Sequence, residues 1–229
     1  MNDQQGPEQP RTARKRRIVW RIALGIVALL VLALVGLYIA SRHEPAFYHR
    51  ALAIDAADLA KGSNRMVRKL AALQSVGQRD GRWDARITDL EVNGWLAVDL
   101  AKNHSKTLPA EMHDPRVAID PSGITAACRF QHGIIDTVLS LKVQPFLSSP
   151  DVVGLRIVRA RAGAIPLPLR RVLDGVTEAA RTAGVPLGWQ HADGDPVALF
   201  AVPDDADRVV RIDTIELRHG EIYISGATR

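Results

Sequence analysis

A long apolar run near the start of the chain constrains the fold most strongly. Between Ile22 and Ala40, nineteen residues contain no charge, asparagine or proline. A helix of this length spans roughly 28 Å, close to the ~30 Å hydrocarbon core of a bilayer. Trp20 and Tyr38 flank the run where aromatic side chains prefer the membrane interfaces. The sequence predicts an uncleaved transmembrane helix over residues 22–40, since a signal peptide has a shorter apolar stretch of about 7–15 residues.

The charges before this run predict its orientation. Only Asp3 and Glu8 oppose the six basic residues there, which are Arg11, Arg14, Lys15, Arg16, Arg17 and Arg21. The positive-inside rule therefore places residues 1–21 in the cytoplasm, and their polar composition predicts a disordered tail. The predicted helix would cross an inner or plasma membrane, and the C-terminal part would lie outside the cytoplasm. Because most of the net charge of +5 lies in this tail, the folded part lacks the basic excess that nucleic-acid binding needs.

The inventory of reactive residues contains no recognisable catalytic or metal-binding motif. Cys128 is the only cysteine, so no intramolecular disulfide can form, and we interpret it as a small buried hydrophobic residue. The seven histidines form no zinc-binding pattern, and the acidic residues near Asp193 lack the spacing of a calcium loop. We therefore expect no metal, no cofactor and no enzymatic activity.

Hydrophobic spacing divides the remainder into two parts. Residues 41–80 show helical periodicity interrupted at Lys61–Asn64, which predicts a juxtamembrane segment of two helices. Residues 81–229 form the expected extracytoplasmic domain, with a strand at 81–87 and a helix from Thr88 to about Asn103. Thr88 and Glu91 have the spacing of a capping box at the start of that helix.

Alternating patterns dominate after Asp114. Strands are predicted around 117–119 and over 124–131, 135–144, 152–162, 187–191 and 197–202, followed by a hairpin over 209–226. An amphipathic helix is predicted over 169–183. The predicted fold class is α+β, with one N-terminal transmembrane helix, a helical juxtamembrane segment, and a curved, largely antiparallel sheet packed on amphipathic helices.

The strand over 153–161 has an unusual pattern. Val153, Leu155 and Ile157 are followed at the same alternation by Arg159 and Arg161. One interpretation is a groove that holds acyl chains inside and an anionic head group at its mouth. The alternative is that the strand leaves the core and its arginines are solvated. The sequence leaves both open.

Three segments carry a resemblance to a known family. They are Leu90–Leu96 (LEVNGWL), Val138–Val143 (VLSLKV) and Ala162–Leu169 (AGAIPLPL). Through them, the region from Ile87 to Val176 resembles YpmS-like bacterial proteins, single-pass membrane proteins, and especially planctomycete members of that type. The resemblance implies a fold similar to tubular lipid-binding domains, in which a curved antiparallel sheet wraps a helix and leaves an apolar channel.

The resemblance also implies which residues bind a ligand. Those that would line the channel, or the core beneath it, are Leu139, Leu141, Val143, Leu155 and Ile157. Arg159 and Arg161 would lie at its rim. The leading functional hypothesis is therefore a membrane-anchored protein that binds a lipid or another apolar ligand near the membrane. The alternative is a scaffold in an envelope complex whose sheet edge or Trp95 helix binds a partner protein, and an envelope hydrolase is a third, less supported possibility.

Overall fold

The structure is a computed structural model with two compact units, residues 1–40 and 41–229. It describes residues 29–76, 80–103, 108–149, 152–168, 173–175, 177, 181, 187–192, 195–201 and 209–229.

The predicted transmembrane helix is the main correction. In the described part of the chain, no single helix is both long and apolar enough to cross a membrane. One helix covers Leu29–Ser41, and the next helix is α2 (Ala46–Leu52). The two helices reach the length and composition of a span only when they are taken together, and a bend separates them. Residues 22–28 of the predicted span lie outside the described residues. The fold-class prediction was therefore wrong, because Leu29–Ser41 extends only about 20 Å at 1.5 Å per residue and the described chain is mostly antiparallel sheet.

The helices that follow begin and end at different residues from those predicted. Helix α3 (Ala56–Val76) runs without a break through Lys61–Asn64, where the sequence predicted a turn. The break lies instead at residues 53–55, where the Asp55 carboxylate accepts a hydrogen bond from the backbone N–H of Ala57 at 2.8 Å. Gly62 stays helical because it is buried in a helix contact, and this packing outweighs its low helix propensity.

The capping-box prediction is confirmed. After strand β1 (Gly81–Thr88), Thr88 caps α4 (Asp89–Gly94): its hydroxyl accepts from the N–H of Glu91 at 3.3 Å, and the Glu91 carboxylate accepts from the N–H of Thr88 at 2.9 Å. The helical run continues through a wider turn, η1 (Trp95–Leu100), into α5 (Ala101–Asn103). It ends at the residue predicted for it.

Two glycines allow α3 and α4 to cross at short range. A methyl group on Gly94 would overlap the backbone of Leu59 and Ser63, and one on Gly62 would overlap the carbonyl group of Leu90. Each glycine thus faces the backbone of the other helix. Only hydrogen fits at this contact.

The strands form two antiparallel sheets rather than the single sheet expected. The larger has the order β2-β3-β4-β5-β8-β7, with β6 paired to β5, and the smaller has the order β1-β10-β9. The bounds are β2 Met112–Asp120, β3 Gly123–His132, β4 Ile135–Ser149, β5 Val152–Ala162, β6 Ile165–Pro166, β7 Leu187–Ala192, β8 Asp195–Ala201, β9 Val210–Arg218 and β10 Glu221–Thr228. These elements confirm the predicted strands and hairpin.

The predicted helix over 169–183 lies largely outside the described residues. Of this segment the structure describes 173–175, 177 and 181, all of them helical.

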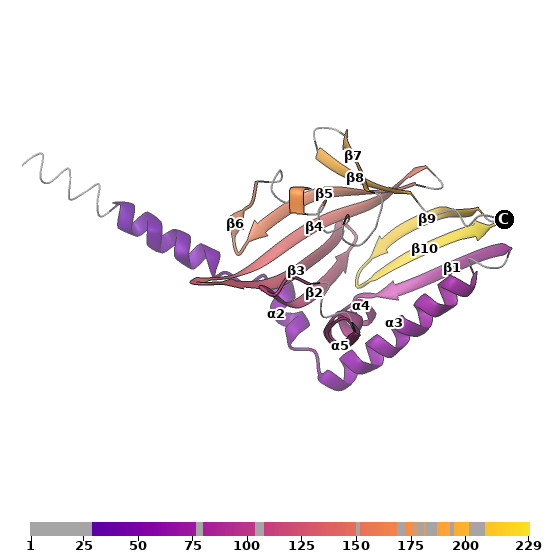
Figure 1. Ribbon diagram of the computed structural model, residues 1–229, viewed down its shortest axis with the longest axis horizontal. Coiled ribbons are helices and arrows are strands. Elements are labelled where there is room, and N and C mark those ends of the chain that lie inside the picture. Colours follow the sequence, from indigo (N-terminus) through magenta and orange to yellow (C-terminus); the bar gives the residue numbers. More distant parts are fainter. Residues whose placement is uncertain are drawn as a thin grey trace, which may run out of the picture. The chain divides into compact units, whose positions relative to one another are not determined.

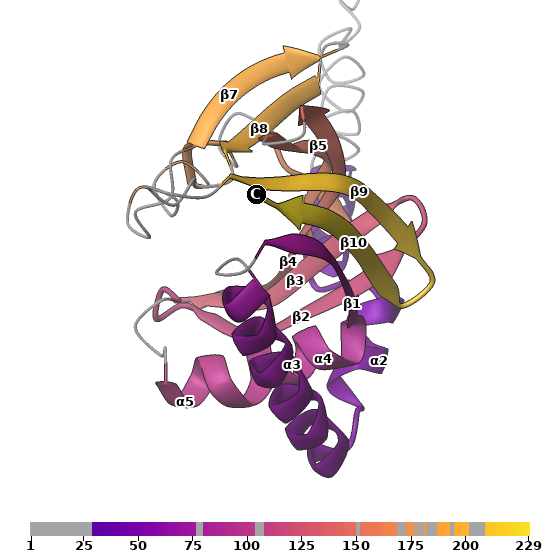
Figure 2. The same cartoon turned by 90° about the vertical axis from the view of Figure 1, so that its right-hand side faces the viewer.

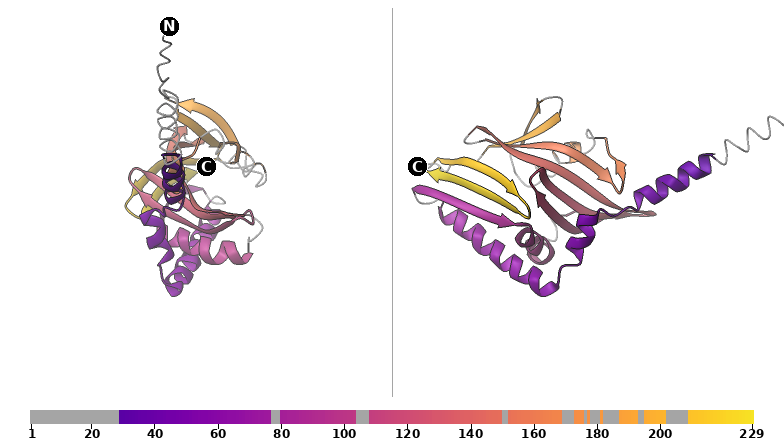
Figure 3. Two further views of the ribbon diagram at one scale, coloured as in Figure 1. Left: turned by 90° about the vertical axis from the view of Figure 1, so that its left-hand side faces the viewer. Right: turned by 180° about the vertical axis from the view of Figure 1, so that it is seen from behind.

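The large sheet is curved (Figures 1 and 2). Helices α2, α4 and α5 lie beneath β2, β3 and β4, while β8 and β7 curve away on the other side (Figures 1 and 2). The view from the opposite side and the view from behind show the same arrangement (Figure 3).

A buried tyrosine joins α2 to the side of the sheet that the helices cover. Tyr48 is fully buried against Ala127 and Val138, and its hydroxyl donates to the carbonyl of Asp114 at 2.9 Å. Burial, together with the negative charge of Asp114, raises the pKa of Tyr48 to about 12.

Candidate functional site on the apolar face of the large sheet

The pairing of β4 with β5 brings five of the predicted ligand-binding residues onto one face. Residues paired across an antiparallel ladder point to the same side, and side chains alternate along each strand. Ile157 is paired with Val143, and Leu155 with Pro145. Leu139, Leu141 and Val143 alternate along β4, so all five apolar residues share a side.

This surface continues across the whole large sheet. We define the apolar face as the residues that share this side through the printed pairings: Ile119, Ile124, Leu139, Leu141, Val143, Val153, Leu155, Ile157, Leu187, Trp189, Ala198 and Phe200. Tyr48 packs on Ala127, which is paired with Ser140 and so points to the other side. The apolar face is therefore the side away from α2.

A β-bulge moves the two predicted rim arginines to the opposite face. The register shifts at Val158: Ile157 is paired with Val143, yet Arg159 is paired with Lys142 and Arg161 with Ser140. The extra residue reverses the alternation, so both arginines share a side with Lys142. Exposure agrees, because Ala160 is 4% exposed while Arg159 and Arg161 are both exposed. The structure thus separates the predicted cationic rim from the apolar residues.

The apolar face is only partly covered. Ile157 and Ala198 are each 2% exposed, whereas Leu139, Leu141, Val143 and Leu155 are half-buried. Near β7, the indole N–H of Trp189 donates to the hydroxyl of Thr177 at 2.8 Å. Helical residues of the 173–177 segment therefore reach this end of the sheet.

Cys128 lies on the same face, opposite Leu139 in the β3–β4 pairing. Burial raises the pKa of its thiol above the ordinary value, which disfavours the reactive thiolate. Its surroundings therefore suit the small hydrophobic role that the sequence suggested.

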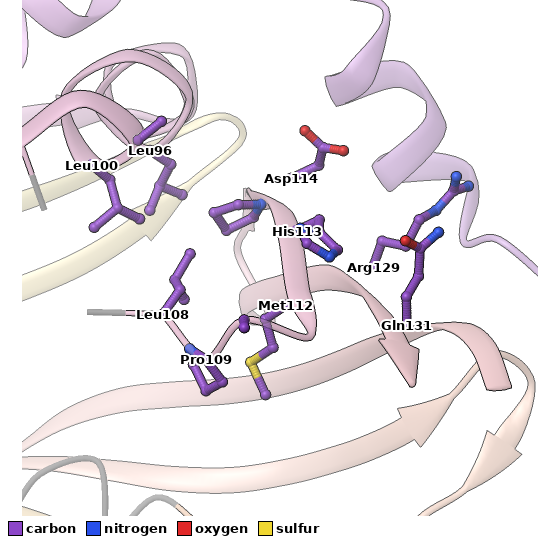
Figure 4. A pocket seen from close by; sticks show the side chains of 12 residues that line it. Leu96, Leu100, Leu108, Pro109, Met112, His113, Asp114, Arg129 and Gln131 are labelled. Carbon is purple, nitrogen blue, oxygen red and sulfur yellow. The ribbon is translucent and has the colours of Figure 1, made fainter. Parts of the chain in front are cut away.

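A hollow of about 580 Å³ lies between the helical run and the start of β2. Leu96 and Leu100 from the helix face Leu108 and Met112, and His113 and Arg129 lie on its polar side (Figure 4). Sequence reasoning missed this hollow, because it depends on how the helix packs beside β2. The Arg129 guanidinium already pairs with Glu44 and lies 3.9 Å from Asp136, so its charge is balanced within the protein.

The described residues contain no group of three or more His, Cys, Asp or Glu side chains placed to hold a metal ion. Comparisons of the whole chain with protein-family models, with curated proteins and with solved structures found no significant match. The resemblance to YpmS-like proteins therefore stays a prediction, and the residues of the apolar face carry the functional argument.

Proposed function

We propose that the chain binds a lipid or another apolar ligand on the apolar face, close to a membrane, and that it does so without catalysis. The observation that carries this proposal is the pairing register, which places apolar side chains from six neighbouring strands on one half-covered face. Each Å² of apolar surface removed from water contributes about 25 cal/mol, and extended exposed apolar surfaces often mark binding sites.

The exposed residues of the first helix support the location near a membrane. The large apolar side chains there are 49–71% exposed, and they are Leu29, Leu30, Val31, Leu32, Leu34, Val35, Leu37, Tyr38 and Ile39. Water is a poor environment for such a surface and a bilayer is a favourable one.

Photocrosslinking of the full chain tests the proposal. A palmitic acid that carries a photoreactive group and an alkyne handle would be incubated with the protein in mild detergent, and the labelled peptides would be identified by mass spectrometry. We expect labels in β4, β5 and β8, and weaker labelling there in Leu141→Gln, which puts a polar group of similar size on the apolar face.

The matched control is Arg161→Gln, which changes the opposite face of the same strand pair and should leave the labelling unchanged. Unfolding midpoints of both variants would show whether the fold persists. Equal labelling of wild type and Leu141→Gln, with both folded, would exclude the apolar face as the site. If crosslinking in native membranes instead gave one dominant protein partner and no lipid, the scaffold hypothesis would replace this one.

A further inference from the structure

The tip of the β3–β4 hairpin is the most exposed apolar feature of the 41–229 unit among the described residues. His132 is paired with Ile135, so Gly133 and Ile134 form a two-residue turn, and Gly133 has a φ of 58°. Ile134 is 97% exposed and Ile135 is 53% exposed. Nothing in the described fold packs on Ile134.

An isoleucine is an unusual residue at this position. In a two-residue turn that begins with a positive-φ glycine, the second position usually carries a polar residue such as asparagine, aspartate or serine, which is well solvated. A β-branched apolar residue stabilises neither the turn nor the core here. Its side chain is available only to something outside the domain.

Contacts at the base of the hairpin connect it to the segment where the apolar helix ends. The hydroxyl of Thr137, two residues after Ile135, donates to the carbonyl of Ser41. Arg129 on the other strand of the hairpin pairs with Glu44. Ser41 is also the last residue of the helix whose large side chains are exposed from Leu29 to Ile39. The hairpin is therefore bonded to Ser41 and Glu44, the segment at which the apolar helix ends.

We propose that Ile134 and Ile135 insert into a lipid bilayer as a second contact in addition to the apolar helix. The occupant is a bilayer because the helix that ends at Ser41 carries large exposed apolar side chains from Leu29 to Ile39. Burial of the two side chains would supply a small part of the free energy of membrane binding. That is enough to fix the orientation of the domain but too little for stable binding alone. This proposal rests on the membrane location within the proposed function.

A fluorophore sensitive to polarity tests the insertion. The full chain would carry Cys128→Ala and a single new cysteine, either Ile134→Cys or Ser148→Cys, labelled with nitrobenzoxadiazole. Ser148 is an exposed residue at the far end of the same strand, roughly 40 Å away at the usual rise per residue. The proteins would be reconstituted in vesicles of phosphatidylcholine and phosphatidylglycerol, with or without lipids that carry a nitroxide quencher in the acyl chain.

We expect the label at position 134 to shift to shorter emission wavelengths and to be quenched by the nitroxide lipids, and the label at 148 to report water. Equal emission and quenching at the two positions would overturn the proposal. A shift at 134 that disappears on dilution and ignores the quencher would also overturn it, in favour of contact with a second copy. Lipid crosslinking to the apolar face would remain if this proposal failed, so the two failures are distinguishable.

Discussion

At the scale of single residues, Glu91 is the buried charge on which the helix contacts depend most. Its side chain is 4% exposed, and it lies 2.7 Å from Lys69 Nζ and 3.4 Å from Arg65 Nε of α3. Burial raises the pKa of its carboxyl group. The hydrogen bonds from Lys69 and Thr88 lower this pKa by more than burial raises it, so the net pKa is below its ordinary value of 4.5. One carboxylate thus caps α4 and holds it to α3.

Glu91→Gln should destabilise the protein by about 1–3 kcal/mol, because an amide cannot replace the charge that two cations face. Denaturant unfolding of the full chain in detergent measures this. Glu216→Gln is the matched control, since Glu216 pairs with Arg218 at 2.9 Å on the exposed surface. An equal loss in both variants would show that burial of Glu91 has no role.

The effect of Glu91→Gln should depend on pH in one direction. The folded-state pKa of Glu91 is lowered, so its stabilisation is fully present above pH 4.5 and is lost as the pH falls through the folded-state pKa. The stability difference between wild type and Glu91→Gln should therefore be constant from pH 5 to 7 and shrink below about pH 4. A difference that stayed constant to pH 3 would contradict this assignment.

At the scale of elements, the crossing of α3 and α4 depends on glycine. Gly94→Ala should cost about 1–3 kcal/mol or more, because the added methyl group meets backbone that cannot move independently. Gly175→Ala is the control: Gly175 is helical and has open space at its Cβ position, so the change should stabilise by about 0.5–1 kcal/mol. Thermal unfolding would rank the two variants.

The bulge in β5 decides which residues the apolar face contains. Deletion of Val158 would remove the extra residue and leave Arg159 directly after Ile157, still paired with Lys142 on the side opposite the apolar face. Both faces keep their residues, so we expect the deletion to preserve cooperative unfolding and to lower the stability by about 1–3 kcal/mol through loss of the local bend. Val158→Ser keeps the bulge and changes only a side chain that is 42% exposed. This substitution should change stability by less than about 0.5 kcal/mol. Similar stability of the two proteins would show that the bulge is dispensable.

At the scale of the whole molecule, the core lies in residues 41–229 and the most extensive exposed apolar surface lies before it. Removal of residues 1–40 should therefore leave cooperative unfolding intact and abolish most sedimentation with vesicles, because the Ile134 hairpin alone is too small to hold the domain on a bilayer. Circular dichroism and vesicle sedimentation measure the two effects. A shortened chain that unfolded without cooperativity would show that the first helix belongs to the core.

The sequence by itself determined the local elements of this protein, because their signals are local. Alternation located the strands from β2 to β5 and from β7 to β10 but not the short β6, and the Thr88–Glu91 spacing located the start of α4. What only the tertiary structure decided is how these elements meet. The sequence around Gly62 predicted a helix break, but Gly62 lies inside α3 because the backbone of α4 packs against it. Alternation in the sequence predicted that Arg159 and Arg161 share the face of Ile157. The extra residue Val158 places them on the opposite face, and this bulge can be recognised only from the pairing with the partner strand. The five apolar residues of β4 and β5 kept their shared face because the extra residue lies on β5 after Ile157, and β4 alternates without interruption from Leu139 to Val143.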